Sequence, residues 1–162
     1  MGDPSEYQMP QPTEQHAWIQ EGVGTWNVDC SFYMGPETMN VKAKETIEMF
    51  GGFFTVSLFE SEMFGAPFKG RATLGYDPAT KQYVSTWCDT MTPQFFHFTG
   101  TFDEAGKVLT MTGEGLDCMS GSMAQYRTTE EHRGPDERVF EMFMTPQGGE
   151  EIKLFTHVYT RA

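Results

Sequence analysis

Basic residues and cysteines are scarce in this chain of 162 residues, and long apolar runs are missing. Its 11 lysines and arginines stand against 23 aspartates and glutamates, which gives a formal net charge of −12. Nucleic acids and anionic membrane surfaces attract clusters of basic side chains, so this composition excludes both as partners. No apolar run approaches the roughly 20 residues that a membrane-spanning helix needs.

The three cysteines, Cys30, Cys88 and Cys118, are odd in number and widely spaced. This pattern is typical of reduced thiols rather than of a disulfide framework. The first 15 residues are polar and rich in proline, without the charged and apolar parts of a signal peptide. We therefore expect a cytoplasmic protein.

Motifs for several kinds of chemistry are also missing. The sequence has no Gly-x-Ser-x-Gly nucleophile motif, no phosphate-binding P-loop and no dinucleotide fingerprint. Its four histidines show neither H-x-H nor H-x-x-x-H spacing, and with the cysteines they are too scattered for a zinc site. No metal site is predicted.

What the sequence does have is a Gly-x-Trp motif, Gly24-Thr25-Trp26, at the start of its first strand-like run. Arg161 lies at the end of the last strand-like run. In a small barrel, such an indole closes one end, and a guanidinium lies over its face with a stabilisation of roughly 0.5–2 kcal/mol. We expect Trp26 and Arg161 to form this structural closure.

The segment before the motif predicts a tail and a helix. Residues 1–12 are expected to form a flexible N-terminal tail. Thr13 can cap a short helix that runs to about Gln20, and Gly22 and Gly24 end it. The rest of the chain, within a single domain of residues 13–162, is expected to form a barrel over residues 24–162.

From Trp26 onward, apolar and polar residues alternate between turn signals. Short strands joined by short loops are typical of an all-β meander, and the last strand can return beside the first to remove the sheet edges. The sequence therefore predicts an all-β fold, a closed antiparallel up-and-down β-barrel of about ten strands. The expected strands are 26–34, 41–49, 53–62, 68–76, 82–89, 94–102, 107–114, 122–129, 138–145 and 151–161.

Several segments carry a resemblance to a known family. They are GVGTW at 22–26, FGGFF at 50–54, GAPFKG at 65–70, LGYD at 74–77, YVSTWCD at 83–89, GTFD at 100–103 and YTR at 159–161. On these segments the chain is identified as a member of the DUF1579 family, small bacterial proteins with a calycin-like, lipocalin-like barrel. The resemblance implies the fold and no mechanism, because the family has no assigned activity.

Polar side chains that point into such a barrel are candidates for function. Asp89 shares a strand face with Trp87, Tyr83 and Ser85. If that face points inward, the Asp89 carboxylate can act as a general acid or base, or anchor the amine or hydroxyl group of a ligand. The alternative is structural: Asp89 caps the loop 90–93 by accepting backbone N–H bonds.

Two glutamates interrupt apolar strand faces in the same way. Strict alternation would bury Glu45, and Arg71 or Arg127 is the expected partner for its carboxylate. Glu141, between Val139 and Phe143, poses the same problem and is the second candidate acid or base. The alternative explanations are a bulge that exposes these glutamates or a structural ion pair for each.

His157 shares a face of the last strand with Phe155 and Tyr159. In outline the chain is similar to nitrobindin-type barrels of ten strands, which hold haem through a histidine late in the chain. One axial histidine in an apolar pocket is sufficient to bind haem. The alternative is that His157 is simply a satisfied or exposed side chain.

The leading hypothesis is a binding protein that holds a small, mainly hydrophobic molecule in its barrel, with no cofactor predicted. The alternatives are an enzyme that uses Asp89 or Glu141, a haem protein that uses His157, and a filled barrel that acts through self-association, for which a homodimer is the simplest form. The expected ligand-binding residues are Phe32, Glu45, Trp87, Asp89, His97, Tyr126 and His157.

Overall fold

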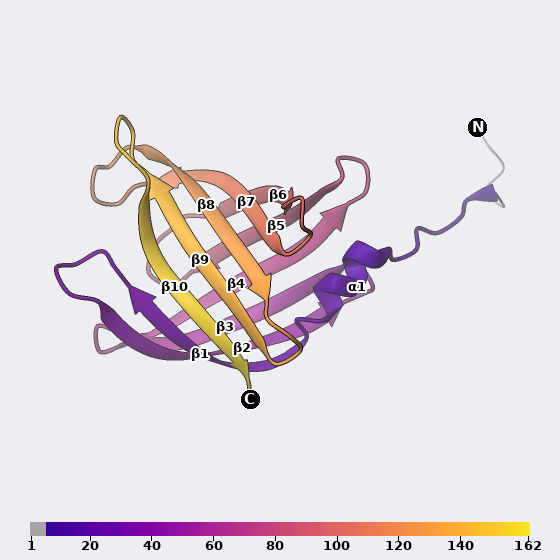
Figure 1. Cartoon of the computed structure of the whole chain (residues 1–162), viewed down its shortest axis with the longest axis horizontal. Helices are drawn as coiled ribbons and strands as arrows, with labels where there is room; N and C mark the ends of the chain where they lie inside the picture. The colour runs from indigo at the N-terminus through magenta and orange to yellow at the C-terminus, as the bar shows by residue number, and fades with distance from the viewer. Residues whose placement is uncertain (1–5) are drawn as a thin grey trace.

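The computed structural model describes residues 6–162, and within them ten antiparallel strands close into one barrel (Figure 1). Each strand pairs with the next along the chain, and the last pairs with the first, so the sheet has no free edge. The predicted fold class is therefore confirmed. The elements are α1 (Glu14–Gln20), β1 (Gly24–Phe32), β2 (Met39–Phe50), β3 (Phe54–Met63), β4 (Ala66–Asp77), β5 (Gln82–Asp89), β6 (Phe96–Phe102), β7 (Val108–Leu116), β8 (Met123–His132), β9 (Glu137–Thr145) and β10 (Ile152–Arg161).

The N-terminal segment leads into helix α1. Of the predicted tail, residues 1–5 lie outside the described residues, and residues 6–12 are exposed. Thr13 is the N-cap residue of α1, and its backbone N–H donates to Nδ1 of His16 at 2.9 Å. Nowhere in the described chain is there a helix of the length and apolarity needed to cross a membrane.

The strands alternate between the inside and the outside of the barrel, as the pleat requires. Trp26, Val28 and Cys30 of β1 are buried, whereas the residues between them are exposed. The pairing of β2 with both β1 and β3 runs without a register shift, so Glu45 points inward. A bulge at Glu45 is therefore the wrong explanation for its place on an apolar face.

The two ends of the sheet meet where Trp26 of β1 stands opposite Arg161 of β10. The guanidinium carbon of Arg161 lies 4.1 Å from the centroid of the indole, and the indole N–H donates to the carbonyl oxygen of Gly22 at 2.9 Å. A Cβ at Gly24 would lie 2.6 Å from Nη1 of Arg161, and its φ of +135° disfavours other residues. This close approach explains the glycine of the Gly-x-Trp motif.

Helix α1 lies across one end of the barrel, beside the ends of β3 and β4 (Figure 1). Its His16 is buried against the rings of Phe53 and Tyr76. Trp18 stacks on the imidazole of His132, with the ring centroids 4.4 Å apart. The helix therefore brings apolar side chains to the lumen from one end.

Candidate functional site in the barrel lumen

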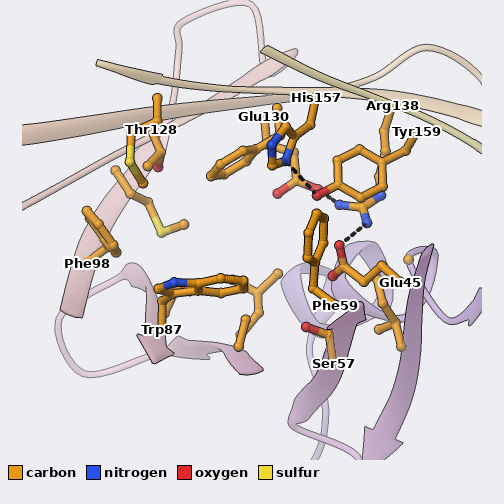
Figure 2. Close-up of a pocket in the computed structure, with 18 of the residues that line it drawn as sticks. Glu45, Ser57, Phe59, Trp87, Phe98, Thr128, Glu130, Arg138, His157 and Tyr159 are labelled. Carbon is orange, nitrogen blue, oxygen red and sulfur yellow. Dashed lines mark hydrogen bonds and ion pairs between the residues drawn. The ribbon is translucent and has the colours of Figure 1, made fainter. Parts of the chain in front are cut away.

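The lumen contains a cavity of about 280 Å³ that is lined by side chains from α1 and the strands. This volume is just below the roughly 300–1,000 Å³ that is usual for small-molecule sites. Most of the wall is apolar and aromatic, as Figure 2 shows for Phe59, Trp87 and Phe98. The other large apolar residues of the wall include Ile19, Phe32, Phe68, Leu74, Met111 and Phe155.

A buried cluster of charged groups forms one side of this cavity, and Arg138 of β9 is at its centre (Figure 2). Its Nη1 donates to Oε1 of Glu130 at 3.1 Å, and its Nη2 lies 3.4 Å from Oε2 of Glu45. The guanidinium carbon is 3.6 Å from the centroid of the Tyr159 ring. Burial alone would lower the pKa of Arg138, but the two carboxylates raise it above its ordinary value, so Arg138 is charged.

Glu130 connects this cluster to the end of the barrel that α1 covers. Burial would raise the pKa of its carboxyl, but His132 and Arg138 hold that pKa below its ordinary value, so Glu130 is ionised. His132 lies between two carboxylates, with Nε2 3.5 Å from Glu130 and Nδ1 3.5 Å from Glu21. His132 thus connects Glu21, at the C-terminal end of α1, to Glu130 in the cavity wall.

His157 is buried next to this charged cluster. Burial, followed by the positive charge of Arg138, lowers its pKa to about 3, so the imidazole is neutral near pH 7. Its Nδ1 lies 3.4 Å from the hydroxyl of Tyr159, whereas its Nε2 is buried and has no hydrogen-bond partner. The rings of Phe155 and Phe59 stack on the imidazole with centroid distances of 4.4 and 5.4 Å.

A haem would need one nitrogen of His157 to be open toward the iron. Here Nδ1 lies 3.4 Å from the hydroxyl of Tyr159, and Nε2 is buried without a hydrogen-bond partner. The rings of Phe155 and Phe59 stack on the imidazole, and a cavity of about 280 Å³ has no room for the four-ring macrocycle of a haem, so the lumen as it stands does not fit that group. Across residues 6–162, moreover, no group of three or more His, Cys, Asp or Glu side chains is placed to hold a metal ion.

Trp87 and Asp89 of β5 both line the cavity, and the hydrogen bonds of Asp89 match its structural alternative, the loop cap. Oδ2 of Asp89 accepts the indole N–H of Trp87 at 2.9 Å. Oδ1 accepts the backbone N–H groups of Met91 and Thr92 at 2.9 and 3.2 Å, which caps the loop after β5. Asp89 thus fixes the orientation of an indole in the cavity wall.

The alternative in which Glu141 points into the lumen as an acid or base is wrong, and a structural ion pair is the explanation that the structure supports. The inward positions of β9 are Arg138, Phe140 and Met142, so Glu141 is on the outer face. There it forms an ion pair with Lys153 and accepts a hydrogen bond from Thr156 at 2.8 Å. These contacts hold the pKa of Glu141 below its ordinary value even though partial burial would raise it. Glu141 therefore cannot act on a molecule in the lumen.

Two of the expected ligand-binding residues also lie away from the cavity. His97 is exposed because Phe96 and Phe98 take the inward positions on either side of it. Tyr126 is buried and points inward, but its hydroxyl donates to the carbonyl oxygen of Leu116 at 2.9 Å and it does not reach the cavity wall. The structure does place five of the expected residues in the wall, namely Phe32, Glu45, Trp87, Asp89 and His157.

The partner of Glu45 is Arg138, and neither Arg71 nor Arg127 reaches it. Arg71 is exposed, and Arg127 forms an ion pair with Glu151 at 2.7 Å. Arg138, Glu130 and Ser57 are cavity residues that the sequence does not predict. A signal was present in β8 and β9, because Glu130 and Arg138 continue the inward alternation of Thr128 and Phe140.

Comparison with known proteins gives a family and a fold. A family model described as "Protein of unknown function (DUF1579)" matches residues 11–161. A crystal structure of Rv2717c from M. tuberculosis superposes with a TM-score of 0.68 at 13% sequence identity, covering 94% of this chain and 99% of that one. A redesigned β-barrel has a TM-score of 0.46 at 12% identity, covering 89% of this chain and 94% of that one. No curated protein matches the sequence significantly.

Proposed function

Because the chain belongs to the DUF1579 family, whose description assigns no activity, we propose a function from the cavity itself: the barrel binds a small, mainly apolar molecule in its lumen. The carrying observation is a cavity of about 280 Å³ inside a closed sheet. Cavities are costly in proteins, since the lost contacts destabilise the fold in proportion to the volume. A cavity of this size that is lined by aromatic rings is well suited to a ligand.

The size and lining of the cavity determine which kind of molecule it can hold. An apolar cavity of about 150 Å³ already accepts benzene. A cavity of about 280 Å³ therefore has room for a substituted aromatic ring. The net charge of −12 favours a small molecule over a nucleic acid as the partner. The proposal requires no cofactor, and the free thiols of Cys30, Cys88 and Cys118 favour the cytoplasm as its place of action.

The test is a substitution that fills the cavity with a larger side chain and leaves the barrel intact. Thr128 is buried in the cavity wall, and its neighbour Thr129 on β8 faces outward. Native mass spectrometry of protein purified from its own host compares the wild type with Thr128→Leu and Thr129→Leu. We expect the wild type and Thr129→Leu to retain a small molecule of the same mass and Thr128→Leu to lose it. The bare polypeptide mass in all three proteins would contradict the proposal.

Self-association is the second candidate function, because the loops at the barrel end opposite α1 carry a ring of exposed apolar side chains. Monomeric proteins seldom expose such apolar patches without a partner. Phe95 in this ring and Phe50 at the other end of the barrel are both 69% exposed, so a substitution of Phe50 is the matched control for one of Phe95. Sedimentation should show a dimer that Phe95→Ser weakens and Phe50→Ser does not. The ring consists of Tyr33, Met34, Phe64, Met91, Phe95, Leu116, Met119, Met123 and Ile152.

A further inference from the structure

The wall of the cavity holds polar atoms that the protein itself leaves without hydrogen bonds. Within residues 6–162, the buried side-chain atoms without a hydrogen-bond partner are Oγ of Ser57, Nε and Nη2 of Arg138 and Nε2 of His157, and of these Nη2 has only its ion pair with Glu45. All three residues line the same cavity. Buried polar atoms in native proteins are nearly always hydrogen-bonded, so these atoms in the wall of one cavity point to a ligand group that would pair with them.

Most of these atoms donate hydrogen bonds. The guanidinium nitrogens of Arg138 are donors only, and the hydroxyl of Ser57 donates freely because the protein makes no other use of it. Nε2 of His157 donates when the hydroxyl of Tyr159 donates to Nδ1. The group that fits them is an oxygen that accepts hydrogen bonds.

The charge balance of the cluster shows which oxygen this is. Arg138 already faces two buried carboxylates, those of Glu45 and Glu130. A ligand carboxylate would bring a third negative charge into a buried site that holds one guanidinium, at a large desolvation cost. An ammonium group carries donors and no acceptor, so it would leave the orphan donors unpaired. The cluster therefore favours an uncharged acceptor, such as a carbonyl oxygen.

We propose that the ligand is an uncharged apolar molecule whose carbonyl oxygen accepts hydrogen bonds from Ser57 and Arg138, while its apolar body lies against Phe59 and Trp87. Figure 2 shows this arrangement of the wall, with Ser57 and Phe59 below the charged cluster and Trp87 across from it. The inference rests on the proposed function, because it names the chemical class of the molecule that the lumen holds.

Three one-ring compounds of similar size separate the contribution of the carbonyl oxygen to binding from those of the apolar ring and of a negative charge. Acetophenone and ethylbenzene have nearly the same shape and differ in the carbonyl oxygen, and benzoate adds a negative charge. Because acetophenone and ethylbenzene differ in their own hydration, each compound is compared between protein variants and not only with the other compound. Isothermal titration calorimetry measures each dissociation constant for the wild type, Ser57→Ala and Ser31→Ala. Ser31 faces outward from β1, where its hydroxyl donates to Asn40, and so provides the matched control.

We expect Ser57→Ala to weaken the binding of acetophenone about two- to tenfold, the usual effect of one lost hydrogen bond, and to leave ethylbenzene unchanged. Ser31→Ala should leave both dissociation constants unchanged, and benzoate should bind the wild type at least about tenfold more weakly than acetophenone. Thermal unfolding of both variants should stay close to that of the wild type.

Two kinds of failure are distinguishable. If ethylbenzene binds but Ser57→Ala acts on both compounds alike or on neither, the carbonyl assignment is overturned and the proposed function stands. Benzoate that binds as tightly as acetophenone overturns the assignment in the same way. If neither ethylbenzene nor acetophenone binds the wild type, the proposed function fails, and the assignment fails with it.

Discussion

The guanidinium of Arg161 covers the Trp26 indole at directly opposed positions of β10 and β1, 4.1 Å from the ring centroid. Arg161 also donates to the carbonyl oxygens of Val23 and Pro135, at 2.8 and 2.9 Å from Nη1 and Nη2. One side chain thus joins the segment before β1, the turn before β9 and the last strand. This contact closes the barrel end at which the chain both enters and leaves the sheet.

The first prediction concerns this closure. Trp26→Ala should lower the free energy of unfolding by about 3–5 kcal/mol, because it removes a fully buried aromatic ring and leaves a cavity. Chemical denaturation measures the change. Phe50→Ala is the control, since this ring is 69% exposed and its loss should cost far less. Equal effects of the two substitutions would show that the indole does not close the barrel.

The second prediction concerns the buried charges. Arg138→Met should destabilise the protein by about 3–5 kcal/mol, because it leaves two buried carboxylates without a counter-charge. The triple variant Glu45→Leu, Glu130→Leu and Arg138→Met should recover most of that loss. Arg127→Met is the matched control, because Arg127 also lies over a ring but pairs with Glu151 at the surface, where such pairs contribute about 0–1 kcal/mol.

Denaturation at constant pH tests both parts of this prediction. A single Arg138→Met variant as stable as Arg127→Met would mean that the two carboxylates are not both ionised in the native state. A triple variant as unstable as the single one would mean that packing, and not charge, accounts for the loss.

The third prediction concerns pH. His157 has a pKa near 3 in the folded protein, below the value of about 6.5 that an exposed histidine has. Between those two values the unfolded chain binds a proton that the folded protein does not, so stability falls as the pH is lowered from about 6.5 toward 3. At pH 5 this difference amounts to about 2 kcal/mol.

His157→Phe should remove this part of the pH dependence, since a phenyl ring fits among Phe59 and Phe155 and does not titrate. His97→Phe, at an exposed position, should leave the pH dependence as it is. Urea denaturation at pH 7.5 and pH 5 compares the three proteins. A wild type and a His157→Phe variant that lose equal stability between the two pH values would contradict the assignment.

The fourth prediction concerns Asp89. Asp89→Asn should lower stability by about 1 kcal/mol and shift the indole N–H resonance of Trp87, because an amide nitrogen replaces one of the two accepting oxygens. Asp103→Asn is the control: Asp103 caps a turn through Lys107 and Val108 without an indole partner. It should leave the Trp87 resonance in place. An unchanged Trp87 resonance in Asp89→Asn would contradict the contact.

The fifth prediction concerns the thiols. Cys88 and Cys118 are exposed, whereas Cys30 is buried on β1. Burial, and then the charges of Asp29 and Glu45, raise the pKa of Cys30 to about 12, so its thiol stays protonated and unreactive. Iodoacetamide should modify two thiols in the native protein and the third only after unfolding. Modification of Cys30 at the rate of the other two would contradict its placement in the core.

The sequence was sufficient for the fold because strand alternation and turn signals are local. The segment 82–89 was predicted with the bounds of β5, and Thr13 was predicted as the helix cap. The inward direction of Glu45 also followed from alternation, because β2 carries no bulge. These features depend on near neighbours in the chain or on the adjacent strand.

The partners across the lumen could not be predicted in the same way. Glu45 on β2 meets Arg138 on β9 although β1 and β10 lie between these strands in the sheet, and no periodicity in the sequence encodes that contact. Alternation offered Glu141 as an inward residue because Val139 and Phe143 make the outer face of β9 apolar as well. The outer side of Phe143 is covered by Arg127, whose guanidinium carbon lies 4.0 Å from its ring centroid.

The most direct test of the account uses the three tryptophans as reporters of binding in the lumen. Trp18 and Trp87 line the cavity, and Trp26 lies outside it as an internal reference. Two-dimensional NMR follows their indole N–H resonances while acetophenone is added to millimolar concentration. The account predicts saturable shifts of the Trp87 and Trp18 resonances and none of the Trp26 resonance. If no indole resonance shifts, or if all three drift together without saturation, the lumen does not bind the molecule and the account is wrong.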